Sequence, residues 1–543
     1  MKVAILPSAT VCLFFVLVFT GSTSNAQVWG SLQKETGKDI DANAQLGNSI
    51  ALAANYALAG APAETKDSSG IQALTDAGAA YLFAKQDTSW VQKVKLVADD
   101  RATGARFGNS VALSTSFALV GATHESKNTT GGDSLQEAGA VYVYRKNGSD
   151  EWIPIQKIVA PDRQAYDQFG SSIAISTNFM VIGAANSSTD ANGSFTMSQA
   201  GAAYVYEFVI SQWIFREKLV ASDRKAFASF GHVVKIDGGI IAIAAPNETD
   251  DDNGQNSYPE AGAVYIFEKS ASIFSQTAKL IPQDRDTADS FGVSMDLSGT
   301  RLVIGADRED EDENNAASLN AAGSAYIFQK QSGNWIEKQK LVANDRSISD
   351  RFGNSVAIGG QGILIGAFYE DHNAWLHDTL ESAGSVYLFK GQGGTWNQAD
   401  KWVPHQRAVG DLFGFSVAMS DTNVLISSPV TNGKDSNGNT VSRSGAVYFW
   451  EFSRRMSQTE WETTPLSFQV YPNPSSGLII LKAAQNFKDE EVFISDLNGK
   501  VLFKSVAGKT NETSLNLHFL PKGMYLISIK NSNNYKSNII VIN

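Results

Sequence analysis

The feature that most constrains this chain is a pair of residues, an aromatic or leucine followed by glycine, that returns at nearly constant spacing. The interval from Gly47 to Gly108 recurs at every later step, except that one extra residue lies between Gly108 and Gly170. The pairs are Leu46-Gly47, Phe107-Gly108, Phe169-Gly170, Phe230-Gly231, Phe291-Gly292, Phe352-Gly353 and Phe413-Gly414. Seven copies at a fixed period predict a repeat architecture, in which each unit buries its apolar faces against its neighbours.

Three further landmarks divide each unit into four short strands. In the second unit, an apolar run closes on Gly121, a tyrosine-containing strand follows Gly139, and Trp152 opens the last strand. Alternating apolar residues, many of them β-branched or aromatic, predict a strand at each of these places. Four strands per repeat predict the blades of a β-propeller, with glycines where the inner strands crowd together.

The spacing also predicts how the ring closes. The segment 29–34 has the pattern of a fourth strand and stands before Gly47 at the interval that the other fourth strands keep, whereas the matching position after the seventh unit holds Ser457 instead of an aromatic. We therefore expect the N-terminal strand to complete the seventh blade, which removes an open sheet edge. The predicted fold is all-β: a seven-bladed propeller over 27–452, followed by a small C-terminal β-sandwich.

The segment 1–26 has the features of a secretory signal peptide. Lys2 supplies a positive charge, Val11–Phe19 form an apolar stretch, and small residues at Ser24 and Ala26 predict cleavage between Ala26 and Gln27. A membrane anchor is the alternative, but the apolar stretch is shorter than the ~20 residues that a spanning helix needs. No other segment is long and apolar enough, so we expect no transmembrane segment in the mature chain.

Composition excludes two classes of chemistry. Cys12, the only cysteine, lies in the predicted signal peptide, so the mature chain should have no disulfide and no thiol chemistry. The 44 Lys and Arg residues are outnumbered by 56 Asp and Glu residues, which argues against a nucleic-acid partner because no excess of cations is available for phosphates.

These repeats resemble the FG-GAP repeats of integrin-α-like β-propellers over roughly 29–450. The resemblance implies the propeller fold but names no ligand. Calcium-binding members of that family carry an Asp-rich loop between strands one and two. Here the same connections are tight hairpins such as 114–116 and 237–239. The usual calcium sites of the family are therefore not carried over to this chain.

The expected ligand face is formed by the long loops between strands two and three of each unit. They span 61–77, 122–138, 184–200, 245–261, 306–322, 367–383 and 428–444. In a four-stranded blade these loops emerge on the same face as the connections between blades. They are polar and differ in composition from blade to blade, as binding loops on a rigid scaffold often do.

Several of these loops share an Asp/Asn-x-x-Gly pattern at one offset. The four copies are Asp67 to Gly70, Asn128 to Gly131, Asp190 to Gly193 and Asp251 to Gly254. One interpretation is calcium ligation by carboxylates and carbonyls. The other is an Asx turn ending in a left-handed glycine. Because Asn128 keeps the shape without the charge, we favour the turn.

Acidic residues of the fourth and fifth loops are the candidate binding residues. They are Asp250, Asp251 and Asp252 of the fourth loop and Asp307, Glu309, Asp310 and Asp312 of the fifth, where Glu311 and Glu313 complete a group of six carboxylates. Carboxylates this close repel one another unless a cation or solvent screens them. A Ca²⁺ site is one hypothesis. A solvated acidic surface is favoured, since the spacing lacks the alternating ligands and the glycine of an EF-hand.

Asp371, His372 and His377 of the sixth loop are the remaining candidate binding residues, and they share that loop with Glu370 and Asp378. The two histidines are five residues apart, which does not match a helical zinc motif.

Asp-Arg recurs five times between blades. The copies are Asp100-Arg101, Asp162-Arg163, Asp223-Arg224, Asp284-Arg285 and Asp345-Arg346. A catalytic constellation would not repeat identically, so we interpret these pairs as structural, capping loops or bridging adjacent blades.

No sequence motif for catalysis is present: the chain has no nucleophile elbow, P-loop or HExxH. We therefore expect a non-catalytic binding or adhesion protein with an unidentified protein or glycan ligand. An extracellular enzyme or polysaccharide-processing module that uses the loop face, and a structural surface component, are the alternatives.

A separate C-terminal domain is predicted at 466–543, after a polar linker at 453–465. Seven candidate strands, at 468–471, 478–482, 491–495, 501–505, 515–517, 523–530 and 537–542, suit a small sandwich. Asn498-Gly499 predicts a hairpin turn.

Three ordered motifs of this domain resemble the type A sorting domain of type IX secretion cargo. They are Tyr471-Pro472-Asn473-Pro474 with Gly477, Asp496-Leu497-Asn498-Gly499-Lys500, and Leu520-Pro521 with Gly523-Met524-Tyr525. The resemblance implies Sec export, passage through the outer-membrane translocon, and removal of this domain on release or on attachment to surface lipopolysaccharide. It places the mature protein outside the cell or on its outer surface.

Overall fold

The computed structural model describes residues 32–271, 273–316, 318–372, 379–404, 406–452, 468–483, 486–487, 490–495, 501–530 and 535–542. The chain divides into two compact units, Met1–Ser453 and Arg454–Asn543. All regular elements of the described residues are strands, and none of these residues forms a helix that could cross a membrane. The predicted signal peptide with Ala26 and Gln27, the segment 29–31 and the linker 453–465 lie outside the described residues.

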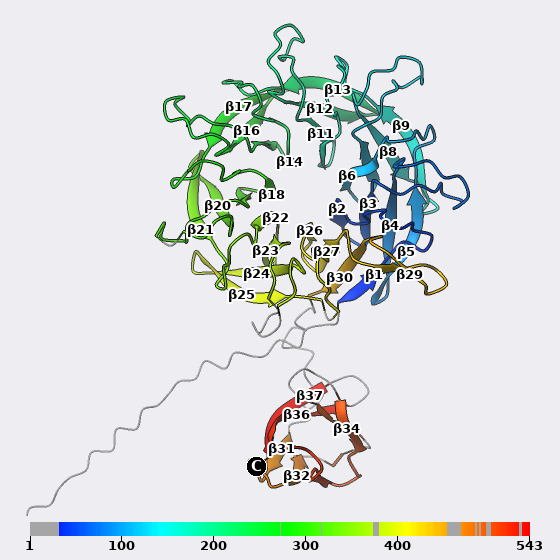
Figure 1. Ribbon diagram of the computed structural model, residues 1–543, viewed down its shortest axis with the longest axis vertical. Coiled ribbons are helices and arrows are strands. Elements are labelled where there is room, and N and C mark those ends of the chain that lie inside the picture. The colour runs from blue at the N-terminus through cyan, green and yellow to red at the C-terminus, as the bar shows by residue number, and fades with distance from the viewer. Residues whose placement is uncertain are drawn as a thin grey trace, which may run out of the picture. The chain divides into compact units, whose positions relative to one another are not determined.

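The described part of the first unit contains seven four-stranded antiparallel sheets, arranged as a ring in Figure 1. The first sheet contains β2 (Ile50–Ala53), β3 (Tyr56–Ala61), β4 (Ala79–Gln86) and β5 (Ser89–Leu96). The second contains β6 (Phe107–Leu113), β7 (Phe117–Ala122), β8 (Ala140–Lys146) and β9 (Trp152–Ile158). The third contains β10 (Ser172–Ile175), β11 (Phe179–Ala184), β12 (Ala202–Val209) and β13 (Gln212–Leu219), and the fourth contains β14 (Val234–Asp237), β15 (Ile240–Ala245), β16 (Ala263–Ser270) and β17 (Ile273–Leu280). The next two are β18 (Ser294–Ser298), β19 (Arg301–Ala306), β20 (Ser324–Gln331), β21 (Asn334–Leu341); and β22 (Phe352–Gly359), β23 (Gly362–Ala367), β24 (Ser385–Gln392), β25 (Thr395–Trp402). This repeated sheet is the β-propeller blade that the sequence predicts.

The seventh sheet joins the two ends of the ring. Its order is β26 (Val417–Met419), β27 (Asn423–Ser428), β30 (Ala446–Glu451) and β1 (Gln33–Glu35). Gln33 pairs with Phe449 and Glu35 with Val447, in antiparallel register. The predicted closure by the N-terminal strand is therefore confirmed for the described residues. A two-stranded ribbon, β28 (Gly433–Lys434) with β29 (Thr440–Val441), lies in the loop between β27 and β30.

Glycines allow neighbouring sheets to approach closely. Gly78 bridges Phe107 of the next sheet in parallel, and a Cβ added to Gly78 would lie 2.0 Å from the Phe107 carbonyl oxygen. Its φ of +84° is also left-handed, a conformation that glycine adopts without strain. Phe107 is fully buried and packs edge-on against Tyr142, with ring centroids 5.3 Å apart. Gly78 thus allows the close approach at this junction, and the buried Phe107 of the next sheet fills it.

The second unit contains two sheets around its own apolar core. One is β31 (Phe468–Tyr471), β32 (Leu478–Ala483) and β35 (Glu512–Asn516); the other is β34 (Val501–Val506), β33 (Glu491–Ser495), β36 (Gly523–Lys530) and β37 (Tyr535–Ile542). Ile479 and Leu481 of the first sheet are fully buried with Val492 and Ile494 of the second. Six strands match the prediction closely, whereas β35 begins three residues earlier than expected.

Candidate functional site

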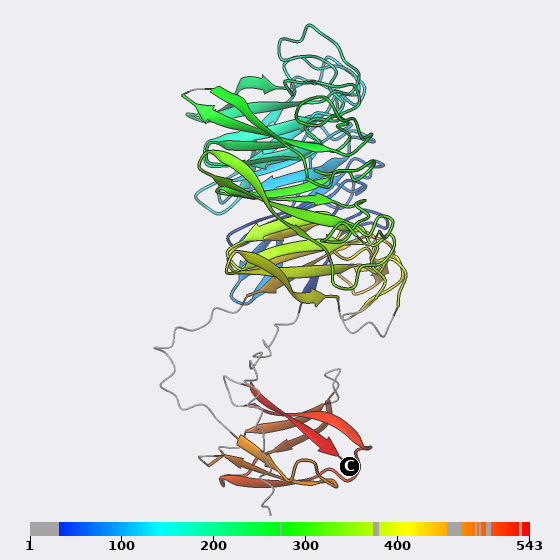
Figure 2. The same cartoon turned by 90° about the vertical axis from the view of Figure 1, so that its left-hand side faces the viewer.

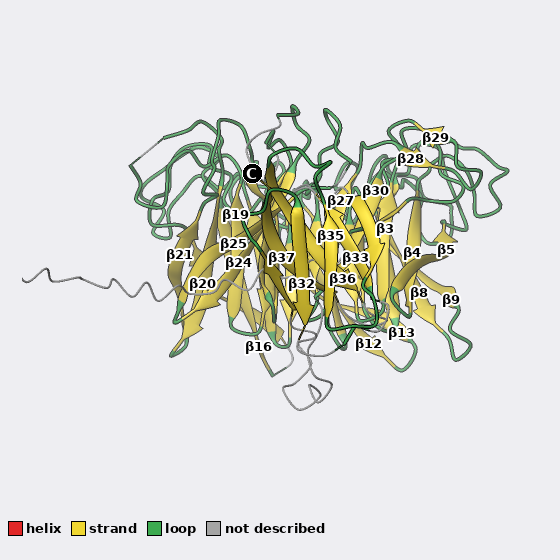
Figure 3. Cartoon of the chain, turned by 90° about the horizontal axis from the view of Figure 1, so that it is seen from below, coloured by secondary structure: helices red, strands yellow, loops and turns green. Residues whose placement is uncertain are grey.

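The long loops of the first unit gather at one end of its strands. Figures 2 and 3 show these loops on one side of the ring and the short turns on the other. We call the first side, formed by the seven long loops and the connections between sheets, the loop face, and the second side the turn face. The predicted candidate binding residues belong to the loop face, except His377, which lies outside the described residues.

An Asx turn shapes the tip of each patterned loop. The Asp67 carboxylate accepts the backbone amides of Ser69 and Ile71, each at 3.0 Å, and Gly70 has a φ of +74°. The hydrogen bond from the Ser69 hydroxyl, with that from the Ile71 amide, lowers the pKa of Asp67 to about 2. The same bonds to the second and fourth following amides recur at Asn128, Asp190, Asp251, Asp312 and Asp435. The turn hypothesis is confirmed.

The arginine of each Asp-Arg pair donates hydrogen bonds to backbone carbonyls at the base of one long loop. Arg163 donates through Nη2 to the Ser126 carbonyl at 2.7 Å and through Nη1 to the Asp133 carbonyl at 3.2 Å, so it grips both sides of the loop. Arg224 and Arg346 make the first of these bonds to Ser188 and Asp310, and Arg407, which follows a glutamine instead of an aspartate, makes it to Asp371. Hydrogen bonds from these arginines to backbone carbonyls therefore hold the base of the loop face.

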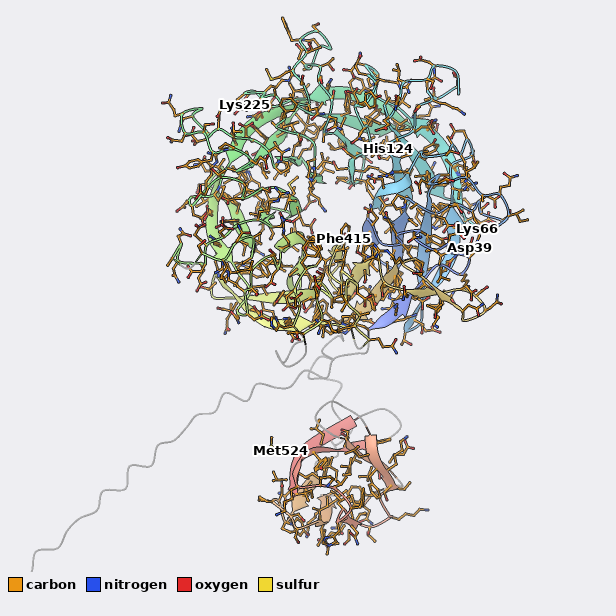
Figure 4. The ribbon with its side chains drawn as sticks, in the orientation of Figure 1. Asp39, Lys66, His124, Lys225, Phe415 and Met524 are labelled. Carbon is orange, nitrogen blue, oxygen red and sulfur yellow. The ribbon has the colours of Figure 1, made fainter. Side chains whose placement is uncertain are left out.

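The aspartate of each pair bridges two sheets. Asp100, which follows β5 of the first sheet, pairs with Lys157 of β9 at 2.6 Å and accepts the Tyr142 hydroxyl at 2.7 Å. The same ion pair recurs as Lys218–Asp162, Lys279–Asp223, Lys340–Asp284 and Lys401–Asp345, at 2.6 to 2.7 Å. Lys95 pairs in the same way, at 2.7 Å, with Asp39, which no arginine follows. Asp39 lies beside Lys66 in Figure 4, at the base of the first loop. The structural interpretation of the Asp-Arg pairs is confirmed.

A second, buried carboxylate completes most of these clusters, and its ion pair with the lysine was missed by the sequence analysis, which named Glu309 only as a candidate binding residue. Glu309 contacts the Lys340 ammonium at 3.1 Å, and its counterparts are Glu64, Glu125, Glu248 and Glu370. The signal was present as a lysine that returns at the period of the repeat. The lysines are Lys95, Lys157, Lys218, Lys279, Lys340 and Lys401. Long charged residues are rarely buried without partners, so a repeated lysine in an apolar strand predicts a repeated ion pair.

The predicted solvated acidic surface of the fifth loop is wrong for Asp307 and Glu309, whereas Glu313 is exposed. Glu309 is 0% exposed and Asp307 is 8% exposed. Glu309 accepts the Glu311 amide at 2.9 Å and the Tyr326 hydroxyl at 2.9 Å, and Asp307 lies 3.5 Å from the Arg351 guanidinium. These two carboxylates can be buried because Lys340 pairs with Glu309 and Arg351 pairs with Asp307.

The carboxyl groups around Glu309 outnumber the cations that pair with them, and the pKa values of several of these carboxyl groups are raised. Burial, together with the charge of Glu309, raises the pKa of Asp289 to about 8. The hydrogen bond with Glu309, together with burial, raises the pKa of Glu311 to about 7. Burial also raises the pKa of Asp307, although Arg351 opposes this. Protons therefore compensate part of the negative charge near neutral pH.

The other predicted acids are also used within the loops. Asp310 accepts the Ala321 amide at 2.7 Å, and Asp250 pairs with Lys225, which lowers the pKa of Asp250. Asp251 and Asp312 form Asx turns, and backbone hydrogen bonds, chiefly from Gln255, lower the pKa of Asp251. Asp252 is exposed and accepts the Asn253 side-chain amide at 2.8 Å.

The sixth loop gives no metal-like arrangement in its described part. His372 lies with Nδ1 3.1 Å from Glu370 Oε1, and Asp371 accepts the Ser382 amide at 2.7 Å. His377 and Asp378 lie outside the described residues. Across the described ranges, no three His, Cys, Asp or Glu side chains are grouped so that they could hold a metal ion.

Two exposed aromatic residues on the loop face were also missed. Tyr166 and Phe227 are 51% and 59% exposed and have φ angles of +69° and +67°. They occupy the same place in successive connections between sheets, where the backbone amide bonds a carbonyl at the end of the preceding long loop, Gln136 for Tyr166 and Ser198 for Phe227. The residues at this place around the ring are Asn43, Gly104, Tyr166, Phe227, Ala288, Ser349 and Gly410, all with positive φ.

In the second unit, the first predicted sorting motif is tied to the last strand. Asn473 Oδ1 accepts the Val541 amide at 2.8 Å, and the Ser475 amide donates to the Val541 carbonyl at 2.8 Å. A Cβ on Gly477 would lie 2.5 Å from His518 Nδ1, so only glycine fits there. The Tyr471 hydroxyl donates to Glu512 at 3.2 Å, within the sheet that holds the motif.

The third sorting motif forms a local turn, because the Tyr525 hydroxyl, two residues after Gly523, donates to the Pro521 carbonyl at 2.7 Å. Pro472 and Pro474 follow cis peptide bonds. Asp496, Gly499 and Lys500 lie outside the described residues.

Comparisons with known proteins agree with both units. The FG-GAP repeat matches residues 90–144, 152–206, 213–267, 274–328, 335–389 and 396–449, and a secretion system C-terminal sorting domain matches 469–543. No curated protein matches the chain. Among solved structures, one chain of a mitotic checkpoint complex crystal structure aligns with 11% identity and a TM-score of 0.43, covering 82% of this chain and 99% of that chain.

The six FG-GAP matches are offset from the sheets by one strand. The match at 90–144 begins in β5 and ends in β8, so each match covers the junction between two sheets together with one complete long-loop region. The strands β1 to β4 form the junction that lies before the first match. On these repeats and on the motifs within 469–543, this chain belongs to the FG-GAP repeat family and ends in a secretion system C-terminal sorting domain.

Proposed function

We propose that this chain is an exported seven-bladed propeller that binds a protein or glycan partner through its loop face and carries out no catalysis. The seven four-stranded sheets and the pairing of β1 with β30 support the seven-bladed ring. The two sheets of the second unit, which share one core, support a C-terminal sandwich. The sorting domain indicates export by type IX secretion, to the cell surface or the medium.

The observation that carries the binding proposal is the pair Tyr166 and Phe227. A residue other than glycine or asparagine is strained at positive φ, and bulky residues are unusual there. Gly104 and Gly410 keep the same φ and the same backbone hydrogen bond at this place, so the fold does not need an aromatic side chain.

Exposure adds a second cost to the strain at these two positions. Each ring presents apolar surface to water, and the Tyr166 hydroxyl is occupied by Gln136 at 2.7 Å. Aromatic side chains with a rigid backbone beneath them are the typical anchors of binding surfaces. We infer that their favourable contacts are made with a partner.

The hydrogen bonds and ion pairs of the acidic loop residues support a non-catalytic function. Most acids of the fourth and fifth loops are bonded to backbone amides, lysines or arginines, and the two carboxyls that bond each other, Glu309 and Glu311, meet at the fully buried Glu309. A catalytic site needs unlike groups brought within hydrogen-bond reach of one substrate position. Nothing comparable among the described residues favours the enzyme alternative.

The test replaces both aromatics with glycine in the mature full-length protein, as Y166G/F227G. Binding to host-cell, protein and glycan arrays should fall at least tenfold, while the melting temperature stays the same or rises because strain is relieved. The matched control is Ile210→Gly on the turn face, since Ile210 is 96% exposed with a φ of +59°. It should gain stability without losing binding.

Four results would contradict the proposal. Unchanged binding by Y166G/F227G would show that Tyr166 and Phe227 do not contact the partner. A lower melting temperature would give these rings a structural role instead. Substrate turnover that disappears in the variant would favour the enzyme alternative, and a wild-type protein that binds nothing would favour a structural surface component.

The route of export is a further part of this proposal. Sec export with cleavage between Ala26 and Gln27, followed by removal of the sorting domain, predicts a secreted or lipopolysaccharide-attached form that lacks both ends. Mass spectrometry of the protein from the cell surface and from the medium measures both termini. A surface form that begins at Met1 would contradict the signal-peptide assignment.

A further inference from the structure

A pocket of about 450 Å³ lies on the turn face, where the short turns of the first two sheets meet. Its walls include Tyr56 at the start of β3, Lys85 in β4 and Lys93 in β5. Lys146 at the end of β8 and Asp150 in the following turn form the opposite wall, together with Thr115. The site is separate from the loop face because it lies at the other end of the strands.

The next junction around the ring explains why this space is open. There Phe117 takes the place of Tyr56, and Phe208 takes the place of Lys146. The rings of Phe117 and Phe208 are 4.9 Å apart, so they fill the junction with aromatic surface. At the first junction Tyr56 keeps its edge-on contact with Trp152 at 5.5 Å, but the second ring is replaced by a lysine whose ammonium lies 4.7 Å from the Tyr56 ring centroid.

The pocket carries surplus positive charge. Lys85 is neutralised outside the pocket, since it pairs with Glu451 at 2.8 Å. Lys93 and Lys146 share a single carboxylate, Asp150, which Lys93 contacts closely and Lys146 approaches at 3.6 Å. The hydrogen bond from Lys93, with that from the Tyr56 hydroxyl, lowers the pKa of Asp150, so this carboxylate is ionised at neutral pH. Two ammonium groups facing one carboxylate leave one positive charge for a ligand.

The polar lining and the size indicate what that ligand is. Asn55, Gln86 and Thr115 add amide and hydroxyl groups suited to hydrogen bonds with hydroxyls, and the volume lies in the range of small-molecule pockets. The chain as a whole has a net charge of −12, so its long-range field does not favour anions and only a local surplus of cations can bind one. We propose that this pocket binds an acidic monosaccharide unit, one that carries a carboxylate or sulfate group.

The test measures binding of glucuronic acid, glucose 6-sulfate, glucose and inorganic sulfate to the mature full-length protein by calorimetry. The two acidic sugars should bind, and glucose should not. The variant K93Q/K146Q should lose at least tenfold in affinity for them. Asp150→Asn should gain about threefold to tenfold, because it releases two ammonium groups from their carboxylate.

A matched control removes two cations from the loop face. Lys66 and Lys225, both labelled in Figure 4, are partly exposed and each pairs with one aspartate, Asp41 and Asp250. K66Q/K225Q lowers the total charge equally and should leave the affinity unchanged. An equal loss in this control would reduce the effect to general electrostatics and overturn the proposal.

The other outcomes are equally decisive. Absence of acidic-sugar binding by the wild type overturns the site, and so does weaker binding by Asp150→Asn, which keeps the test valid even where K93Q/K146Q folds poorly. Inorganic sulfate that binds as tightly as glucose 6-sulfate would show that the pocket recognises an oxyanion and not a sugar, which also overturns the proposal. None of these results depends on whether the loop face binds a partner.

Discussion

The third and fifth sheets share one framework but neutralise their buried lysine in different ways. In the fifth sheet Lys340 faces two carboxylates, Asp284 at 2.6 Å and Glu309 at 3.1 Å. In the third sheet Lys218 faces Asp162 at 2.7 Å and, in place of the second acid, donates to the Thr189 hydroxyl at 2.6 Å. One carboxylate and one hydroxyl are therefore sufficient to satisfy this lysine.

The second acid changes the charge around it. Asp167 and Asp289 occupy the same place in the two sheets, two residues before the buried phenylalanine. Burial raises the pKa of Asp167 to about 6, whereas burial and Glu309 together raise the pKa of Asp289 to about 8. The extra glutamate therefore makes the fifth sheet depend on bound protons to offset its negative charge. In the third sheet, one carboxylate and one hydroxyl satisfy the lysine.

The largest expected effect comes from removing the lysine. Lys340→Met leaves two buried carboxylates without their cation and should lower the free energy of unfolding by about 3–5 kcal/mol. Lys218→Met leaves only Asp162 and should cost roughly half as much. Urea denaturation of the two variants at pH 7 measures this difference. Equal losses would mean that Glu309 takes a proton as soon as Lys340 is gone.

The second effect is a dependence of stability on pH. A carboxyl group whose pKa is higher in the folded state keeps its proton there, so stability falls as pH rises from about 4 to the folded pKa. For Asp289 that decline extends to about pH 8, and for Asp167 it ends at about pH 6. Asp289→Asn should therefore raise the free energy of unfolding at pH 9 by on the order of 2–4 kcal/mol, and Asp167→Asn by less.

The measurement is urea denaturation of both variants and the wild type at pH 5, 7 and 9. Asp289→Asn should flatten the profile between pH 6 and 8, where Asp167→Asn should leave it unchanged. Identical profiles for the two variants would contradict the assignment of surplus acid to the fifth sheet.

The smallest effect should be the same in both sheets. Asp190 and Asp312 accept amides in the same Asx geometry, including those of Ser194 and Ala316. Replacing either aspartate with alanine should speed hydrogen exchange of that amide roughly tenfold and leave global stability unchanged. Mass-spectrometric exchange on loop peptides measures this. A larger change at the fifth loop would show that its surplus acid also acts at the loop tip.

Much of the fold was predictable from spacing alone. The aromatic or leucine of each aromatic-glycine pair lies against a glycine of the neighbouring sheet that has no room for a Cβ, so the recurrence of the pairs locates every sheet junction. The pattern at 29–34 predicted the partner of β30. Strand limits were less certain, as at β35, because two or three residues at the end of a strand carry no distinct pattern.

Less of the candidate site was predictable. The Asx turns follow from local sequence, since Asp67 and its counterparts bond amides only two and four residues away. The burial of Glu309 and the pairing of Asp100 with Lys157 depend on contacts between neighbouring sheets, which a count of nearby charges does not reveal. Tyr166 and Phe227 were missed because left-handed backbone at non-glycine residues leaves no mark in composition.

The pairing of β1 with β30 has a consequence for how the molecule is made. Gln33 is among the first residues of the ring to be synthesised and Phe449 among the last, so the seam that joins them forms only when the whole ring is available. A product that stops before Ala446 keeps two unpaired sheet edges, the kind of surface that proteases and aggregation act on. The pairing of one short strand therefore requires that the chain has been synthesised through β30.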